Sequence, residues 1–175
     1  MESIYIKKVT LEHVDQLQKV SRQTFLEAFS AGNTGENMEK YLNERFTTEL
    51  LTAELNYPDS EFYFASIDHT VIGYLKVNAG KSQTVLQDGK GLEIERIYVL
   101  QEFLGKRVGQ LLYEKAMQIA REKNADYIWL GVWEENARAI QFYKKNGFVE
   151  FDKHLFRLGD DEHTDIMMKI ELAVL

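Results

Sequence analysis

The sequence contains no cysteine, and this absence excludes a disulfide framework, a thiolate metal site and a cysteine nucleophile. Histidine is scarce as well. The four histidines, His13, His69, His154 and His163, are scattered, and no two share one turn of a helix. We therefore expect no metal site.

Long apolar runs are also missing. No stretch approaches the roughly 18 residues of a membrane span, and residues 1–9 lack the apolar core and cleavage site of a signal peptide. A cytoplasmic protein without a membrane partner is expected. The net charge of −7 gives no basic footprint, so nucleic-acid binding is not expected. An acidic surface can attract a cationic substrate, although mild acidity also simply favours solubility.

The composition is otherwise ordinary for a globular protein, with 45% hydrophobic and 28% charged residues. A length of 175 residues favours one domain over residues 1–175. The N-terminal part reads as a strand over 4–9, a helix capped by Thr10 and reaching Phe29, and a second helical region over 38–51. The single proline, Pro58, lies in the loop that follows.

The remaining residues alternate between strand and helix patterns. The expected elements are strands over 62–67 and 70–77 joined by Asp68-His69, a strand over 92–100, a helix over 105–124, a strand over 127–133 buried on both faces, a helix over 134–146, and a hairpin of 148–158 with 164–172. This order predicts an α+β fold, a mixed α/β sandwich with helices on both faces of a mixed sheet.

Two carboxylates mark the strand over 92–100. With a period of two, Glu93 and Glu95 share a face with Ile97 and Val99, while Arg96 lies on the other face. Buried carboxylates need a partner or a function. The pair is either functional or belongs to an edge strand, solvated or bridged to Arg96.

The turn after this strand carries Gly105 and Gly109, with Lys106 and Arg107 between them. Glycines let the backbone approach a ligand, and the N–H groups at a helix N-terminus form an anion site. The turn is neither a P-loop nor a dinucleotide fingerprint. It is either an anion site or an ordinary turn.

The helix after the 127–133 strand places Asn136 and Tyr143 on or beside one stripe with Ala139 and Phe142. Tyr143 is either functional or a core aromatic residue whose hydroxyl is satisfied.

These segments together resemble the GNAT superfamily of N-acetyltransferases. Residues 136–148 read Asn-x-x-Ala-x-x-Phe-Tyr-x-x-x-Gly-Phe, and the strand ending Ile-Tyr-Val before a glycine-bearing turn is similar to the family's acyl-CoA motif. The resemblance extends over nearly the whole chain to bacterial PaiA-type spermidine/spermine N-acetyltransferases, through residues 36–38, 41–42, 92–98, 128–133, 139–145, 159–162 and 164–165.

The resemblance implies the GNAT fold, with a mostly antiparallel mixed sheet, and acetyl-CoA as the co-substrate. Its implied cofactor-binding residues are Ile97, Tyr98, Val99, Leu104, Gly105, Lys106, Arg107, Val108, Gly109, Asn136 and Tyr143. One departure is clear, because Leu104 and Arg107 stand where the family has Gln/Arg and Gly. Either this loop follows another path, with Lys106 and Arg107 contacting phosphate, or CoA binding is weakened.

The resemblance also implies direct attack of an amine on the thioester. Tyr143 would be the general acid for the leaving thiolate and Glu95 the base, directly or through water, with Glu93 as the substitute. The expected acceptor is a polyamine, held by Asp160, Asp161 and Glu162, or by Glu27, Glu36 and Glu39, beside the aromatic residues Phe25, Phe29 and Tyr41. Those carboxylates could equally be only solvated.

Two alternatives stay open. The acceptor could be a peptide or protein amine or another small amine, or the chain could be a catalytically silent CoA-binding regulatory module. Homodimers are common in the family, and the resemblance allows one here.

Overall fold

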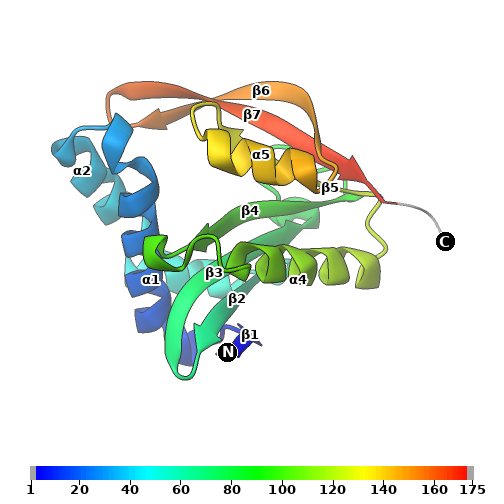
Figure 1. Cartoon of the computed structure of the whole chain (residues 1–175), viewed down its shortest axis with the longest axis horizontal. Coiled ribbons are helices and arrows are strands. Elements are labelled where there is room, and N and C mark those ends of the chain that lie inside the picture. The colour runs from blue at the N-terminus through cyan, green and yellow to red at the C-terminus, as the bar shows by residue number, and fades with distance from the viewer. Residues whose placement is uncertain (1–2, 173–175) are drawn as a thin grey trace.

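The computed structural model describes residues 3–172, which build one seven-stranded sheet in the order β1-β2-β3-β4-β5-β7-β6 (Figure 1). Neighbouring strands are antiparallel except β4 and β5, which run parallel. The strands are β1 (Ile4–Lys8), β2 (Ser60–Ile67), β3 (Thr70–Ala79), β4 (Gly91–Val99), β5 (Tyr127–Trp133), β6 (Val149–Leu158) and β7 (Asp161–Glu171). The predicted mixed, mostly antiparallel sheet is confirmed.

Helices cover both faces of the sheet, as predicted. They are α1 (Val14–Phe29), α2 (Gly35–Arg45), α3 (Thr48–Asn56), α4 (Val108–Glu122) and α5 (Ala137–Lys145). The first three bury their apolar residues against Phe62, Phe64 and Tyr74. The other two lie on the opposite face, where α4 buries Leu112 and α5 buries Tyr143 (Figure 1).

The second predicted helix, over 38–51, is in fact two helices. α2 ends at Arg45, and the hydroxyl of Thr47 accepts a hydrogen bond from the N–H of Leu50 (3.1 Å), which starts α3. A threonine cap satisfies an N–H group that the first helical turn leaves unpaired. The apolar spacing continues across this break, which is why periodicity alone merged the two helices.

The closing hairpin is tighter than predicted, because β7 already begins at Asp161 and leaves only Gly159 and Asp160 in the turn. Gly159 has a φ of 62° and lies so close to Asn37 of α2 that a side chain there would clash. The β6–β7 hairpin is therefore fixed against α2, on the face that carries α1.

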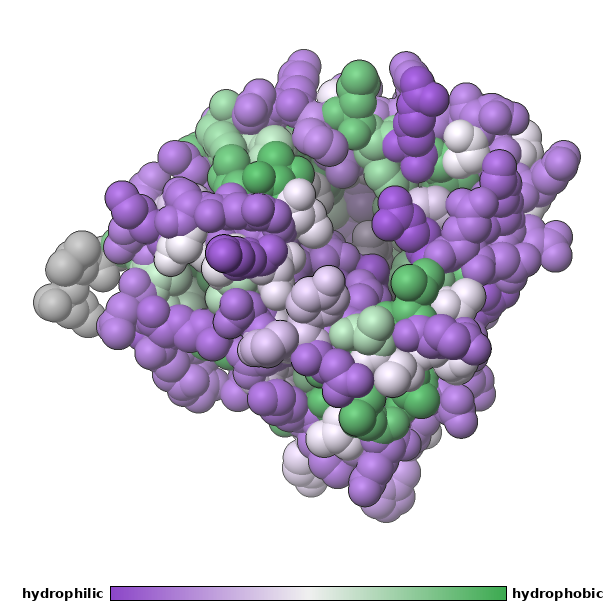
Figure 2. Space-filling view, turned by 180° about the vertical axis from the view of Figure 1, so that it is seen from behind, coloured by the Kyte–Doolittle hydropathy of each residue, from purple (hydrophilic) through white to green (hydrophobic). Residues whose placement is uncertain are grey.

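Most of the back of the molecule is hydrophilic, and its surface is hollowed near the centre (Figure 2). Among residues 3–172, no helix is long and apolar enough to cross a membrane.

Candidate active site

The site is created where β4 and β5 separate. The two strands pair only from Gly91 with Tyr127 to Glu93 with Trp129, and beyond that point each continues without the other. β4 carries a bulge at this point: Lys76 of β3 pairs with Arg96 and Val77 pairs with Ile94, so Glu95 is an extra residue. A bulge bends its strand, which accounts for the divergence.

The prediction that the 127–133 strand is buried on both faces is therefore wrong at its C-terminal end. Gly131 is exposed, because β4 no longer covers it. A cavity of about 610 Å³ occupies the wedge between the strands and reaches α1, the β4–α4 turn and α5.

Nearly all of the predicted site residues line this one cavity. They are Glu95, Ile97, Tyr98, Val99, Leu104, Gly105, Arg107, Val108, Gly109, Asn136 and Tyr143. Lys106 is not among the lining residues, and its ammonium lies 5.4 Å from the centre of the Phe103 ring. The cavity thus runs along a strand edge and a turn, which suits an extended ligand.

The β4–α4 turn resolves the departure at Arg107. This residue adopts φ 67° and ψ 11°, the left-handed conformation that favours glycine, and Gly105 has φ 81°. The helix therefore begins at Val108 rather than at Gly105 as predicted. Its first helical hydrogen bond runs from Leu111 to the carbonyl of Arg107, so the preceding N–H groups are free of helical partners.

Cationic side chains surround these N–H groups. Arg107, Arg138 and Lys145 all line the cavity, and a guanidinium nitrogen of Arg138 lies 3.6 Å from the Cβ position of Gly105. The positive end of the α4 dipole and these cations favour an anion in this part of the cavity, and its binding there stays a prediction. Sequence reasoning missed Arg138 and Lys145, although their spacing of seven places both on one side of α5.

Replacing Arg107 by glycine removes two things, the strain of a positive φ and the charge of the guanidinium, and each has its own measurable effect. We expect Arg107→Gly to raise the free energy of unfolding by about 0.5–1 kcal/mol, because glycine adopts positive φ without the 1–2 kcal/mol cost of a side chain. The same change should raise KM for the expected acetyl-CoA several-fold, since a phosphate contact is lost. Thermal unfolding and steady-state kinetics measure the two effects.

Arg107→Ala is the matched control, because it removes the guanidinium but keeps the strained φ. It should raise KM to a similar extent without increasing stability. An Arg107→Gly protein that is no more stable than Arg107→Ala contradicts the assignment of strain to this position.

Tyr143 of α5 also lines the cavity. Its ring packs against Phe148, with centroids 5.6 Å apart, and only 6% of the residue is exposed. Burial raises the pKa of Tyr143, and its hydroxyl forms no hydrogen bond with a side chain in residues 3–172. The phenol therefore stays protonated at neutral pH and is available to a ligand in the cavity.

Asn136 precedes α5 and caps it. Its side-chain oxygen accepts a hydrogen bond from the N–H of Ala139 (3.2 Å), so α5 starts at Ala137 and not at 134 as predicted. The side-chain amide of Asn136 remains at the cavity wall, where it can donate to a ligand.

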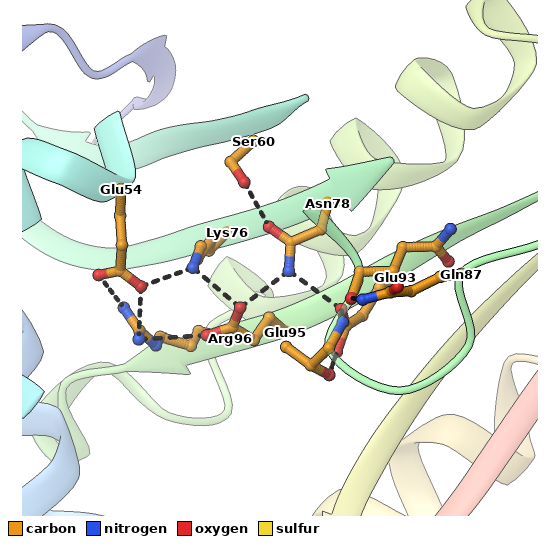
Figure 3. Close-up of polar contacts among 10 residues, drawn as sticks. Glu54, Ser60, Lys76, Asn78, Gln87, Glu93, Glu95 and Arg96 are labelled. Carbon is orange, nitrogen blue, oxygen red and sulfur yellow. Dashed lines mark hydrogen bonds and ion pairs between the residues drawn. The ribbon is translucent and has the colours of Figure 1, made fainter. Parts of the chain in front are cut away.

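The two carboxylates of β4 lie in a buried polar network (Figure 3). Glu95 accepts hydrogen bonds from Lys76 (2.8 Å) and Asn78 (2.8 Å) and pairs with Arg96 (3.1 Å). Glu54 of α3 closes the network, at 2.6 Å from Lys76 and 3.0 Å from Arg96. Because Glu95 is the bulged residue, Arg96 lies on the same side and not on the opposite face that a period of two predicted.

These contacts set the basicity of the two carboxylates. Burial alone would raise the pKa of Glu95, but the charges of Arg96 and Lys76 lower it to about 2. Burial raises the pKa of Glu93, whose carboxylate is held by Asn78 (3.0 Å) and by the N–H of Thr84 (2.8 Å). Glu95 is thus a fixed negative charge and a weak base, which argues against direct proton removal by this residue.

The residues predicted to hold a polycation are mostly occupied or remote from the cavity. Asp161 accepts a hydrogen bond from Asn37 (3.0 Å), and Glu162 pairs with Arg157 (2.6 Å). Asp160, Glu36 and Glu39 are exposed, and none of these five lines the cavity. Glu27 does line it, and its carboxylate accepts the N–H of Gln101 (3.0 Å).

The predicted aromatic wall exists only in part. Phe29 lines the cavity and packs against Trp133, with centroids 5.6 Å apart. Phe25 stacks on Tyr41 at 4.5 Å, behind Phe29 and away from the cavity wall. In the part of the chain that the structure describes, no group of three or more His, Asp or Glu side chains could hold a metal ion.

Comparisons with known proteins agree with this geometry. The family model described as "Acetyltransferase (GNAT) family" matches residues 23–148. An uncharacterised N-acetyltransferase of the pepI 3′ region of Lactobacillus delbrueckii subsp. lactis is 38% identical, over 99% of this chain and 100% of its own length. A spermidine N(1)-acetyltransferase of Thermoplasma acidophilum is 27% identical, over 95% of this chain and 96% of its own.

A solved structure of the PaiA N-acetyltransferase from Thermoplasma acidophilum, in complex with coenzyme A, has the same fold. It superimposes with a TM-score of 0.80 at 25% identity, and the match covers 97% of this chain and 99% of that chain. With these similarities and a cavity suited to acetyl-CoA, the chain belongs to the GNAT acetyltransferase family and is an acetyl-CoA-dependent N-acetyltransferase.

Proposed function

We propose that the enzyme transfers the acetyl group of acetyl-CoA to a primary amine of a polyamine such as spermidine. The similarity to a spermidine N(1)-acetyltransferase supports this choice of acceptor, and so does the net charge of −7. The observation that carries the mechanism is the separation of β4 from β5, with the Tyr143 phenol at the wall of the resulting cavity.

The start of α4, the edge of β4 and Asn136 bind the co-substrate. The N–H groups at the start of α4, together with Arg107 and Arg138, hold the pyrophosphate. The edge of β4 from Ile97 to Val99 faces the gap instead of a neighbouring strand, so its backbone pairs with the pantetheine amides as a further strand would. Asn136 donates from its side-chain amide near the thioester.

The chemistry is a direct transfer. The amine nitrogen attacks the thioester carbonyl carbon, and the carbon–sulfur bond breaks as the tetrahedral intermediate collapses. Tyr143 donates its phenol hydrogen to the departing thiolate, and the phenolate regains a proton from the attacking nitrogen through solvent; burial, which raises the pKa of Tyr143, favours this return. The Glu95 carboxylate, with its low pKa and its pairing with Lys76 and Arg96, orients a water molecule that carries the ammonium's other proton to solvent.

The alternatives make different predictions. The altered turn at Leu104 and Arg107 favours a catalytically silent CoA-binding module. Arg107, however, adopts a φ of 67°, the left-handed conformation that glycine would adopt there. A peptide or protein amine as acceptor would need an open path past α1, where Phe29 and Trp133 pack together at the cavity wall. Cytoplasmic location, homodimer formation and a single domain over residues 1–175 stay predictions.

A competition among amines tests the choice of acceptor. Thiol release from acetyl-CoA should be faster with spermidine than with a peptide bearing a free N-terminus or a lysine. A higher kcat/KM for either peptide than for spermidine would contradict the polyamine proposal and leave the acetyltransferase assignment intact.

A further inference from the structure

A carboxylate that the mechanism does not use lies beside the cavity. Asp165 of β7 pairs with Trp133 of β5, at the C-terminal end of β5, which does not pair with β4. A Cβ placed on Gly131, a residue of the cavity wall, would lie 3.4 Å from Oδ2 of Asp165. Gly131 carries no side chain, so the Asp165 carboxylate lies close behind this part of the cavity wall without lining the cavity itself.

Asp165 differs from the carboxylates that line the cavity. Glu27 accepts the N–H of Gln101, and Glu95 is held by Lys76, Arg96 and Asn78. Asp165 is half-buried, and no group within residues 3–172 gives it a hydrogen bond or an ion pair. Burial raises the pKa of Asp165 in spite of the nearby His154 and His163, as expected of a carboxylate that lacks a cationic partner.

Aromatic residues occupy strand positions next to Asp165: Trp133 is its cross-strand partner on β5, and His163 precedes it by two residues on β7. Trp133 meets the ring of His163 edge-on, with centroids 5.1 Å apart, and Phe29 packs against Trp133. Phe156 of β6 lies 6.2 Å from His163, and Nε2 of His163 lies 2.9 Å from the side-chain oxygen of Asn33. A carboxylate among aromatic faces is the environment that binds an alkylammonium group.

We infer that the Asp165 carboxylate binds a second, non-reacting ammonium group of the polyamine, with the Trp133 ring as its wall. An ammonium ion held on a carboxylate keeps its proton and is not nucleophilic. The nitrogen at Asp165 is therefore not the one that attacks, and the other end of the same molecule extends past Gly131 to the thioester. The inference rests on the proposed polyamine activity, and it makes Asp165 the residue by which the enzyme prefers a polyamine to a monoamine.

The test compares spermidine with butylamine, which has one amino group. The wild-type enzyme should have a kcat/KM for spermidine at least about tenfold above that for butylamine, since a charge-assisted contact is worth that much. Asp165→Asn should lower kcat/KM for spermidine about tenfold or more, mainly through KM, and leave the value for butylamine within about twofold. The affinity for acetyl-CoA, measured by calorimetry, should not change.

Asp152→Asn is the matched control, because Asp152 is an exposed aspartate of the same hairpin whose carboxylate, within the described residues, accepts only the N–H of Lys153. It should leave both amines unaffected. A wild-type enzyme that does not prefer spermidine overturns the proposed polyamine function and this inference together. A wild-type preference that survives in Asp165→Asn overturns the inference alone.

Discussion

Tyr143→Phe is expected to lower kcat about 100-fold while leaving KM for acetyl-CoA within about twofold, since positioned proton donors contribute 10²–10⁴-fold. The substitution removes one oxygen from a residue that is 6% exposed and whose hydroxyl has no partner among residues 3–172. Packing against Phe148 is retained, so stability should hardly change. Steady-state kinetics with thiol detection, together with thermal unfolding, measures these quantities.

Tyr113→Phe provides the matched control. Tyr113 of α4 is 5% exposed, packs against the same Phe148 ring at 5.8 Å and does not line the cavity. Its hydroxyl should contribute nothing to turnover. If both substitutions reduce kcat to the same small extent, Tyr143 is only a core aromatic residue, which is the other interpretation that the sequence allowed.

The second large effect concerns stability. Lys76→Met should lower the free energy of unfolding by about 3 kcal/mol, because it leaves two partly buried carboxylates without one of their two cations. Lys76 is buried and each carboxylate side chain is only 19% exposed, so water replaces the lost contacts with Glu54 and Glu95 only in part. Urea unfolding followed by circular dichroism gives this value.

Two further variants test the reason for this loss. Lys76→Met with Glu95→Gln should lose less than the sum of the single changes, because the double variant removes a buried charge of each sign. Lys8→Met is the surface control: Lys8 pairs with Glu61 at 3.3 Å, is largely exposed and should cost less than about 1 kcal/mol. If the losses in free energy of unfolding of Lys76→Met and Glu95→Gln simply add in the double variant, the two side chains do not interact.

The order of strands and helices could be read from the sequence because local chemistry marks most boundaries. The Asp68-His69 turn, with Asp68 at φ 54°, and the end of α5 at Gly147, with φ 100°, follow from residue type. The break between α2 and α3 could not be read, because the Thr47 cap lies inside a continuous apolar pattern.

The segments that build the site could be predicted from the sequence, but the arrangement of their side chains in space could not. A strict period of two placed Arg96 away from Glu95, whereas the bulge brings them into contact and gives Glu95 a pKa of about 2. Residues 164–165 carry part of the family resemblance, but no local pattern places Asp165 beside the cavity, because that position depends on the pairing of β5 with β7, two elements far apart in the sequence.

A crystal structure with acetyl-CoA bound tests most directly whether the gap between β4 and β5 is the thioester site. The pantetheine should lie between residues 94–99 and 130–133, hydrogen-bonded to the β4 edge, and the Tyr143 hydroxyl should point at the thioester sulfur. A pantetheine bound elsewhere, with the gap closed by the protein's own side chains or the Tyr143 hydroxyl turned into the core, would contradict this assignment.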